Sequence, residues 1–242
     1  MAIPNFNDTR ESKIRFMCGR YTLKAISEIL ADQFDFTELP EAKPRYNIAP
    51  SQLVACVRSI PRSQSREVVM LRWGLIPSWA KDLAIGMKLI NARAETVDER
   101  PSFRKSFRQR RCLVLADGFY EWRKEKRAKQ PYYIRMKDER PFAFAGLWEC
   151  WTNPEGKVVE SCALMTTEPN ELMTPIHNRM PVIIDPDCYG EWLNPMQQEV
   201  TKLNALLGPY PAEDMIAYPV SQLVNNASFD DPRCIEPLVE QG

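Results

Sequence analysis

The chain has 242 residues and a mass of 28.0 kDa, with 44% hydrophobic and 26% charged residues and a formal net charge of zero. This composition is ordinary for a globular domain with a hydrophobic core, and no apolar run approaches the ~18 residues that a membrane-spanning helix needs. The first 17 residues lack the apolar segment of a secretory signal. We therefore expect a cytoplasmic protein with one main domain and no membrane partner, and we expect it to be a monomer.

Short apolar runs separated by turn residues predict a chain made mainly of strands. In chain order, we expect strands at 18–23, 53–58, 68–73, 112–122, 131–136, 142–151, 158–167, 180–185 and 215–218. Helical periodicity and capping patterns, including the capping box Thr96-x-x-Glu99, predict helices at 24–36, 97–108, after Asp185 and at 197–206. Many antiparallel strands with short helices between them indicate an α+β fold with one barrel-like sheet system.

Basic side chains are concentrated in one stretch of the sequence. Residues 93–129 contain twelve basic and six acidic side chains, whereas from Pro141 onward the only basic residues are Lys157, Arg179, Lys202 and Arg233. A basic zone on a neutral protein attracts a polyanion while the remaining surface repels it. Taken alone, such a run is more often a solvated helix face.

The seven cysteines form no C-x-x-C pair, and His177 is the only histidine. We therefore expect reduced thiols, no metal site and no cofactor. Core packing is the default explanation for five of the thiols, at positions 56, 112, 150, 162 and 188. Cys18 differs because it follows Met17: if translation starts at Met17, removal of that methionine exposes an N-terminal cysteine.

An N-terminal cysteine offers two nucleophiles on one residue. Its α-amine has an ordinary pKa of about 7.7–8.0 and its thiol one of about 8.5, so both are usable near neutral pH. The amine captures an aldehyde as a Schiff base, and the thiol then closes a five-membered thiazolidine ring. The ring-opened sugar of an abasic site presents such an aldehyde.

Three polar residues lie in segments that otherwise read as apolar. Asn91 follows a predicted strand, Glu121 lies between aromatic residues in ADGFYEW, and His177 lies in PIHNRMPVII. A carboxyl group between aromatic side chains is desolvated, which raises its pKa toward the range of a general acid or base. Taken singly, a cap, an exposed strand position and a surface histidine explain the three residues as well.

Together, the segments MCGRYTL, RYNIAP, WGLIPSW, INARAET, RRCLVLADGFYEW and PIHNRMPVI closely resemble the SRAP family, whose name stands for SOS response-associated peptidase. The resemblance runs from Met17 to about Asn226. It implies the SRAP fold, a single domain with a bifurcated, barrel-like sheet of mainly antiparallel strands and peripheral helices. We expect this domain at 18–230, a non-native or removed leader at 1–17 and a C-terminal tail at 231–242.

The resemblance also implies a function, namely that the protein senses abasic sites in single-stranded DNA and shields them in a thiazolidine crosslink. Cys18 would be the nucleophile and Glu121 the acid and base, while His177 would assist proton transfer and Asn91 would position the cysteine. By the same resemblance, Arg20, Arg93 and Arg179 would bind phosphates. Asn47, Pro50 and Trp73 would contact the bases beside the lesion.

One departure from the family pattern is the segment before Cys18, because an amide nitrogen cannot form a thiazolidine. The autopeptidase activity implied by the resemblance would remove that segment, with Cys18 attacking the preceding peptide bond. Strand cleavage through the Schiff base, as in a lyase, is a further implied activity. Two alternatives stay open, namely a cysteine peptidase without DNA crosslinking and a non-catalytic reader of modified DNA.

Overall fold

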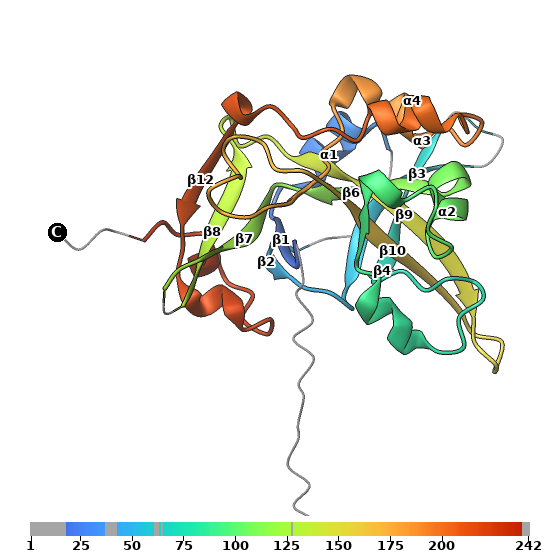
Figure 1. The fold of residues 1–242 in the computed structure, drawn as a ribbon, viewed down its shortest axis with the longest axis horizontal. Coiled ribbons are helices and arrows are strands. Elements are labelled where there is room, and N and C mark those ends of the chain that lie inside the picture. Colours follow the sequence, from blue (N-terminus) through green and yellow to red (C-terminus); the bar gives the residue numbers. More distant parts are fainter. Residues whose placement is uncertain (1–17, 37–42, 61–62, 64, 127, 239–242) are drawn as a thin grey trace, which may run out of the picture.

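The computed structural model describes residues 18–36, 43–60, 63, 65–126 and 128–238. Two sheets built mainly of antiparallel strands form its centre, and short helices lie around them (Figure 1). The predicted α+β class with a barrel-like sheet system is therefore confirmed.

Five strands close into a barrel in the order β10-β4-β3-β6-β9, because β9 also pairs with β10. Neighbours around the barrel are antiparallel except β4 and β10, which are parallel. Two shorter strands pair with β10 as well, β5 in parallel and β11 antiparallel. The bounds are β3 Leu53–Ser59, β4 Arg66–Trp73, β5 Asn91–Arg93, β6 Arg111–Ala116, β9 Phe142–Thr152, β10 Val158–Thr167 and β11 Met180–Pro181.

The second sheet has the order β12-β8-β7-β1-β2 and is antiparallel throughout. Its strands are β1 Arg20–Leu23, β2 Arg45–Ile48, β7 Gly118–Lys124, β8 Lys129–Met136 and β12 Met215–Pro219. The strand β1 lies between β2 and β7. This order brings the segment just before β1 next to the middle of β7.

The α-helices are short, with bounds α1 Ser27–Phe34, α2 Arg104–Gln109, α3 Tyr189–Leu193 and α4 Val200–Ala205. The 3₁₀ helices are η1 Leu83–Lys88, η2 Ala94–Thr96, η3 Pro186–Cys188, η4 Ala212–Asp214, η5 Gln222–Asn225 and η6 Pro232–Cys234. In α1, Leu30 and Phe34 are buried, whereas Ile29 and the N-cap residue Ile26 are exposed.

The helix predicted at 97–108 is wrong in its first half. Only Arg104–Gln109 is α-helical, and the capping-box threonine Thr96 ends η2 instead. Pro101 gives the physical reason, because a proline disfavours helical geometry at the residue before it. The chain therefore turns at this point and starts α2 three residues later.

The strand predicted at 112–122 is also corrected, since it is two strands in different sheets. Asp117 separates β6 from β7, and its carboxylate accepts hydrogen bonds from Thr22 Oγ1 at 2.6 Å and from the main-chain nitrogens of Lys24 and Ala25 at 2.5 and 2.9 Å. These bonds tie the break to the end of β1. The chain thereby passes from the barrel into the second sheet at Asp117.

Two further expectations differ from the structure near the end of the chain. Of the strand predicted at 180–185, only Met180–Pro181 forms β11, and the following residues cross to β9 through the Phe144–Ile183 bridge. Residues 231–238, the described part of the tail expected at 231–242, pack on the second sheet. Cys234 is fully buried there, and Val220 pairs with Pro237.

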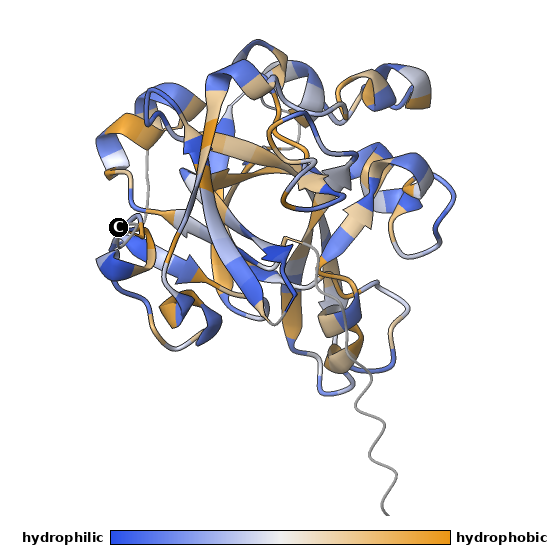
Figure 2. Cartoon of the chain, turned by 60° about the vertical axis from the view of Figure 1, so that its left-hand side comes forward, coloured by the Kyte–Doolittle hydropathy of each residue, from blue (hydrophilic) through white to orange (hydrophobic). Residues whose placement is uncertain are grey.

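Apolar side chains fill the space enclosed by the barrel and the second sheet. Tyr21 of β1 makes edge-to-face contacts with Trp73 and Phe144, whose ring centroids lie 5.4 and 5.7 Å away. Figure 2 shows hydrophobic residues along the central strands and more hydrophilic residues on the surrounding loops. Of the five cysteines expected in the core, Cys56, Cys112 and Cys162 are buried, whereas Cys150 and Cys188 are only partly buried.

Candidate functional site

Cys18 lies immediately before β1 and directly beside Glu121 of β7. Its main-chain nitrogen donates a hydrogen bond of 2.6 Å to Glu121 Oε1, across 103 residues of sequence. The register of the two strands, with Arg20 opposite Tyr120, produces this contact. The backbone of Cys18 has a φ of 41°, in the left-handed region that residues other than glycine rarely adopt.

The carboxyl group of Glu121 is almost completely buried, with 2% of the residue exposed. Burial raises its pKa to about 8, although the Cys18 N–H and the Lys129 ammonium favour the ionised form. Burial, rather than a charged neighbour, is therefore what raises this pKa. At neutral pH this carboxyl group holds a proton and can donate it.

The thiol of Cys18 is buried as well. Burial raises its pKa, and the nearby Glu121 acts in the same direction. The resting state of the sulfur is therefore the neutral thiol, and attack by the sulfur requires a base to take its proton.

Asn91 approaches Cys18 from the other sheet. It begins β5, which runs parallel to β10 with Asn91 opposite Leu164. Its Nδ2 donates to the Cys18 carbonyl oxygen over 3.5 Å. The structure thus brings Cys18, Glu121 and Asn91 together from the segment before β1, the middle of β7 and the start of β5, which are far apart in the sequence.

His177 lies in the turn that follows β10, and its side chain is partly buried. The main-chain N–H of Arg179 donates to His177 Nδ1 at 3.2 Å. Burial lowers the pKa of His177, and the cations Lys129 and Arg179 act in the same direction, whereas the Arg179 backbone opposes them. The ring is therefore neutral at pH 7. Nδ1 also lies 3.3 Å from the Arg179 carbonyl oxygen, so it accepts from the Arg179 N–H when the ring proton is on Nε2 and donates to that carbonyl oxygen when the proton is on Nδ1.

The three candidate phosphate-binding arginines have different surroundings. Arg93 is exposed at the end of β5. Arg20 is partly buried, which lowers its pKa, and its Nε has no hydrogen-bond partner among the described residues. Arg179 is engaged already, because Glu95 holds both of its terminal nitrogens. Arg93 is therefore the most exposed of the three guanidinium groups, while Arg20 and Arg179 each keep a buried Nε without a partner among the described residues.

Two of the three residues expected to contact bases are fully buried. Asn47 Nδ2 donates to the carbonyl oxygens of Val224, Asn226 and Phe229, and Trp73 Nε1 donates to Ile90. A base cannot reach either side chain in this structure, so the expected direct contact is corrected to a structural role. Pro50 is partly exposed and remains accessible.

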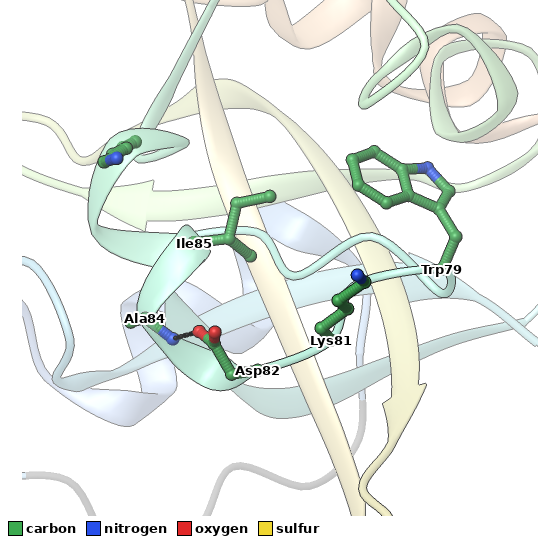
Figure 3. A pocket seen from close by; sticks show the side chains of 6 residues that line it. Trp79, Lys81, Asp82, Ala84 and Ile85 are labelled. Carbon is green, nitrogen blue, oxygen red and sulfur yellow. Dashed lines mark hydrogen bonds between the residues drawn. The ribbon is translucent and has the colours of Figure 1, made fainter.

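Sequence reasoning missed Trp79, which is 59% exposed in the loop between β4 and β5. The indole lines a cavity of about 430 Å³ (Figure 3). The other lining residues are Lys81 and Asp82 before η1 and Ala84, Ile85 and Lys88 within it. The close approach of Gly74 and Gly86 shapes this loop, since a Cβ on Gly86 would lie 2.6 Å from the Gly74 carbonyl oxygen. The available signal was a tryptophan among polar residues in IPSWAKD, where no apolar periodicity explains it.

The basic stretch at 93–129 does not form one surface. Arg111 is buried and donates only to main-chain carbonyl oxygens, among them that of Trp192. Arg110 pairs with the buried Glu149. Arg110 and Arg111 therefore stabilise the fold. Attraction of a polyanion depends on the remaining basic residues of the stretch.

No group of three or more His, Cys, Asp or Glu residues could hold a metal ion within the described part of the chain. In the same part, no helix is long and apolar enough to cross a membrane.

Residues 17–227 match the family described as SOS response associated peptidase (SRAP). Abasic site processing protein YoqW of Bacillus subtilis (strain 168) is 48% identical over 224 residues, which cover 91% of this chain and 99% of that protein. Abasic site processing protein HMCES of Xenopus tropicalis is 34% identical, with 81% of this chain and 67% of that protein covered. A crystal structure of a Bacteroides thetaiotaomicron protein superposes with a TM-score of 0.83 at 29% identity, covering 92% of this chain and 100% of that one.

Proposed function

The chain belongs to the SOS response associated peptidase family, and on this basis we propose that it processes abasic sites in single-stranded DNA by covalent capture through Cys18. The observation that carries the proposal is the 2.6 Å contact between the Cys18 nitrogen and Glu121 Oε1. Capture of an aldehyde needs an amine, a thiol and a proton carrier at one point. This contact supports their convergence.

The proposed reaction has two bond-forming steps. The α-amine of Cys18, once free, attacks the C1′ aldehyde of the opened sugar, and loss of water gives an iminium ion. The Cys18 sulfur then attacks the same carbon, and the thiol proton departs to a base. The five-membered ring contains both new bonds, N–C and S–C, and no oxidant or reductant takes part.

Glu121 suits the proton transfers in both steps. In its protonated form it donates the proton that the carbinolamine hydroxyl needs in order to leave as water, and the resulting carboxylate accepts the thiol proton. Burial, which raises the pKa of Glu121 to about 8, allows this group to hold a proton at neutral pH. A free α-ammonium group on Cys18 would oppose that shift, since an adjacent positive charge favours the carboxylate.

We assign Asn91 and His177 supporting roles. Asn91 Nδ2 donates a hydrogen bond to the carbonyl oxygen of Cys18 and so holds the main chain of Cys18 in place. His177, which is neutral at pH 7, would hydrogen-bond the opened sugar through Nε2. Positioning of this kind is effective because two nucleophiles must meet one carbon in order.

The DNA strand would pass between two kinds of surface. Arg93 would offer its exposed guanidinium group to the phosphates, and the partly buried Arg20 would contribute beside it. Trp79 offers an exposed ring for a base, and Lys81, Asp82 and Lys88 line the same cavity (Figure 3). Stacking tolerates any base, as a reader of lesions requires.

A peptidase reaction at the same residue is the second candidate function. The positive φ of Cys18 places backbone strain at the residue whose thiol would attack the preceding carbonyl carbon. A thioester would form as the C–N bond breaks, with the thiol proton passing to the released amine, and water would then hydrolyse the thioester. Glu121 hydrogen-bonds the nitrogen that leaves. The two functions are sequential, because the peptidase step generates the amine for capture.

The proposal is tested with abasic single-stranded DNA and the Cys18→Ala variant. The parent protein should form an adduct that survives heating, and the variant should not, whereas its salt-sensitive binding to intact single-stranded DNA should persist. An adduct of undiminished yield in the variant would exclude Cys18. A parent protein that binds modified bases but never forms an adduct would instead favour a non-catalytic reader.

A further inference from the structure

Arg179 is held by a carboxylate that has no part in the reaction steps above. Glu95 Oε1 accepts a hydrogen bond from Arg179 Nη1 at 2.5 Å, and Glu95 Oε2 accepts one from Nη2 at 2.9 Å. Nη2 also donates to the Thr166 carbonyl oxygen at 2.6 Å. The guanidinium group is thus fixed from two sides.

This pair joins β5 to the turn after β10. Glu95 lies in η2, directly after Arg93, and Thr166 is the partner of Arg93 in the β5–β10 register. Arg179 is two residues beyond His177 and donates its main-chain N–H to His177 Nδ1 at 3.2 Å. The contacts therefore form one chain from Glu95 through Arg179 to His177.

A carboxylate at this place is unfavourable for binding DNA. Half of the Glu95 side chain is exposed. Glu95 is two residues after Arg93, and the charge of Arg93 acts on the Glu95 carboxylate. An exposed negative charge beside a phosphate path repels the strand. The hydrogen bond with Arg179 lowers the pKa of Glu95, so the charge is present at neutral pH. A residue whose only role was to strengthen DNA binding would not carry a negative charge.

We propose that Glu95 is a positioning residue, which fixes the guanidinium group of Arg179 and thereby holds the His177 ring through the contacts of its Nδ1 with the Arg179 main chain, so that Nε2 faces the opened sugar. This inference rests on the proposed function. Arg179 accordingly acts on the reaction through His177 and is not a free phosphate ligand. The carboxylate acts on the rate of capture after binding, at some cost to affinity.

Glu95 is expected to speed capture but to weaken DNA binding. Because these two effects oppose each other, Glu95→Gln tests the role. Loss of the ion pair loosens the turn that carries His177, and displacement by about 1 Å in such a site can lower a rate by up to 10²-fold. Removal of a negative charge beside the strand strengthens binding at low salt. We expect adduct formation at saturating DNA to slow by about 10-fold, with unchanged or tighter non-covalent binding.

The control is Glu168→Gln. Glu168 lines the same 350 Å³ cavity as Glu95, and among the described residues it makes no ion pair with Arg179. Glu168→Gln should share any gain in affinity and keep the parent rate. Glu95→Asp, which retains the charge, should recover part of the rate. Non-covalent affinity is measured with DNA that carries a tetrahydrofuran abasic analogue, which has no aldehyde.

The pH profile separates positioning from general stabilisation. Burial is the main cause that lowers the pKa of His177, with Lys129 and Arg179 acting in the same direction. A loosened turn exposes the ring to water, so the acidic limb of the rate profile should move to higher pH in Glu95→Gln. Three results would each overturn the role of Glu95. Glu95→Gln could form the adduct at the rate of the parent protein, or saturating DNA could restore its lowered rate. Glu95→Gln could also capture DNA faster while binding it more tightly. If the parent protein forms no adduct at all, the proposed function itself fails, and this inference fails with it.

Discussion

The main-chain nitrogen of Cys18 and Oε1 of Glu121 lie 2.6 Å apart although 103 residues separate them. The pairing of β1 with β7 creates this contact, and burial of the carboxyl group gives it its chemistry. The nitrogen is the atom that peptidase action would release and that capture would use. A single carboxyl group therefore adjoins both proposed reactions.

Glu121→Gln should slow adduct formation by about 10²–10⁴-fold, because Gln cannot transfer a proton and general acid–base catalysis contributes on that order. Binding to single-stranded DNA should change little. Single-turnover rates at saturating abasic DNA measure the effect. A near-parent rate would assign proton transfer to another group.

The same variant should change how stability depends on pH. The pKa of Glu121 in the folded chain, about 8, exceeds its ordinary value of 4.5. Between these values the folded state binds the extra proton, so the free energy of unfolding falls as pH rises. Glu121→Gln should lack this decline and should melt at a higher temperature than the parent at pH 8. Thermal melts from pH 5 to 8 test this, and parallel curves would contradict the raised pKa.

Trp79→Ala should weaken binding to single-stranded DNA by about 1–3 kcal/mol, the usual worth of one stacked base. The loss should not depend on the base, since every base offers a ring face. Met196→Ala removes an even more exposed apolar side chain, in the connection between α3 and α4, and is the control. Equal affinity of Trp79→Ala and the parent would remove this loop from the DNA path.

Arg93→Glu should weaken binding to any sequence and flatten its dependence on salt. Each phosphate contact with single strands contributes about 0.7 to the slope of log K against log salt. Arg104→Glu, which alters an exposed cation on α2, serves as the comparison. Affinities measured over a salt series give the slopes, and identical slopes for the parent and Arg93→Glu would exclude the contact.

Asn47→Ala should destabilise the protein by about 2–4 kcal/mol without a specific defect in capture. The side chain donates to three carbonyl oxygens of the segment after β12, and unpaired buried polar groups are costly. The folded fraction should crosslink at the parent rate at 20 °C. A selective loss of DNA binding with normal thermal stability would restore Asn47 to the base-contacting residues.

Much of the fold follows from local sequence. Strand-forming runs such as FAFAGLWECW and VVESCALMTT predict β9 and β10 within a residue or two, and their continuous apolar stretches are typical of buried strands. Where local signals failed, a neighbour in sequence or in space was decisive. Pro101 delays α2, and the hydrogen bonds of Asp117 to the end of β1 divide one apparent strand between two sheets.

The candidate site shows the same division. Residue types and the family motifs single out Cys18, Asn91, Glu121 and His177, because amine, thiol, amide, carboxyl and imidazole chemistry belongs to side chains and termini. Exposure is different, since it depends on what packs around a residue. Asn47 and Trp73 are buried, and Trp79 is not.

The sequence by itself determined which functional groups the chain carries and which segments can form strands, since both are properties of single residues and short runs. The tertiary structure alone decided which groups meet. The strand order brings the Cys18 nitrogen to Glu121, burial raises the pKa of that carboxyl group, and the ion pair with Glu95 restrains Arg179. These are long-range effects, because distance and desolvation are set by residues that are remote along the chain.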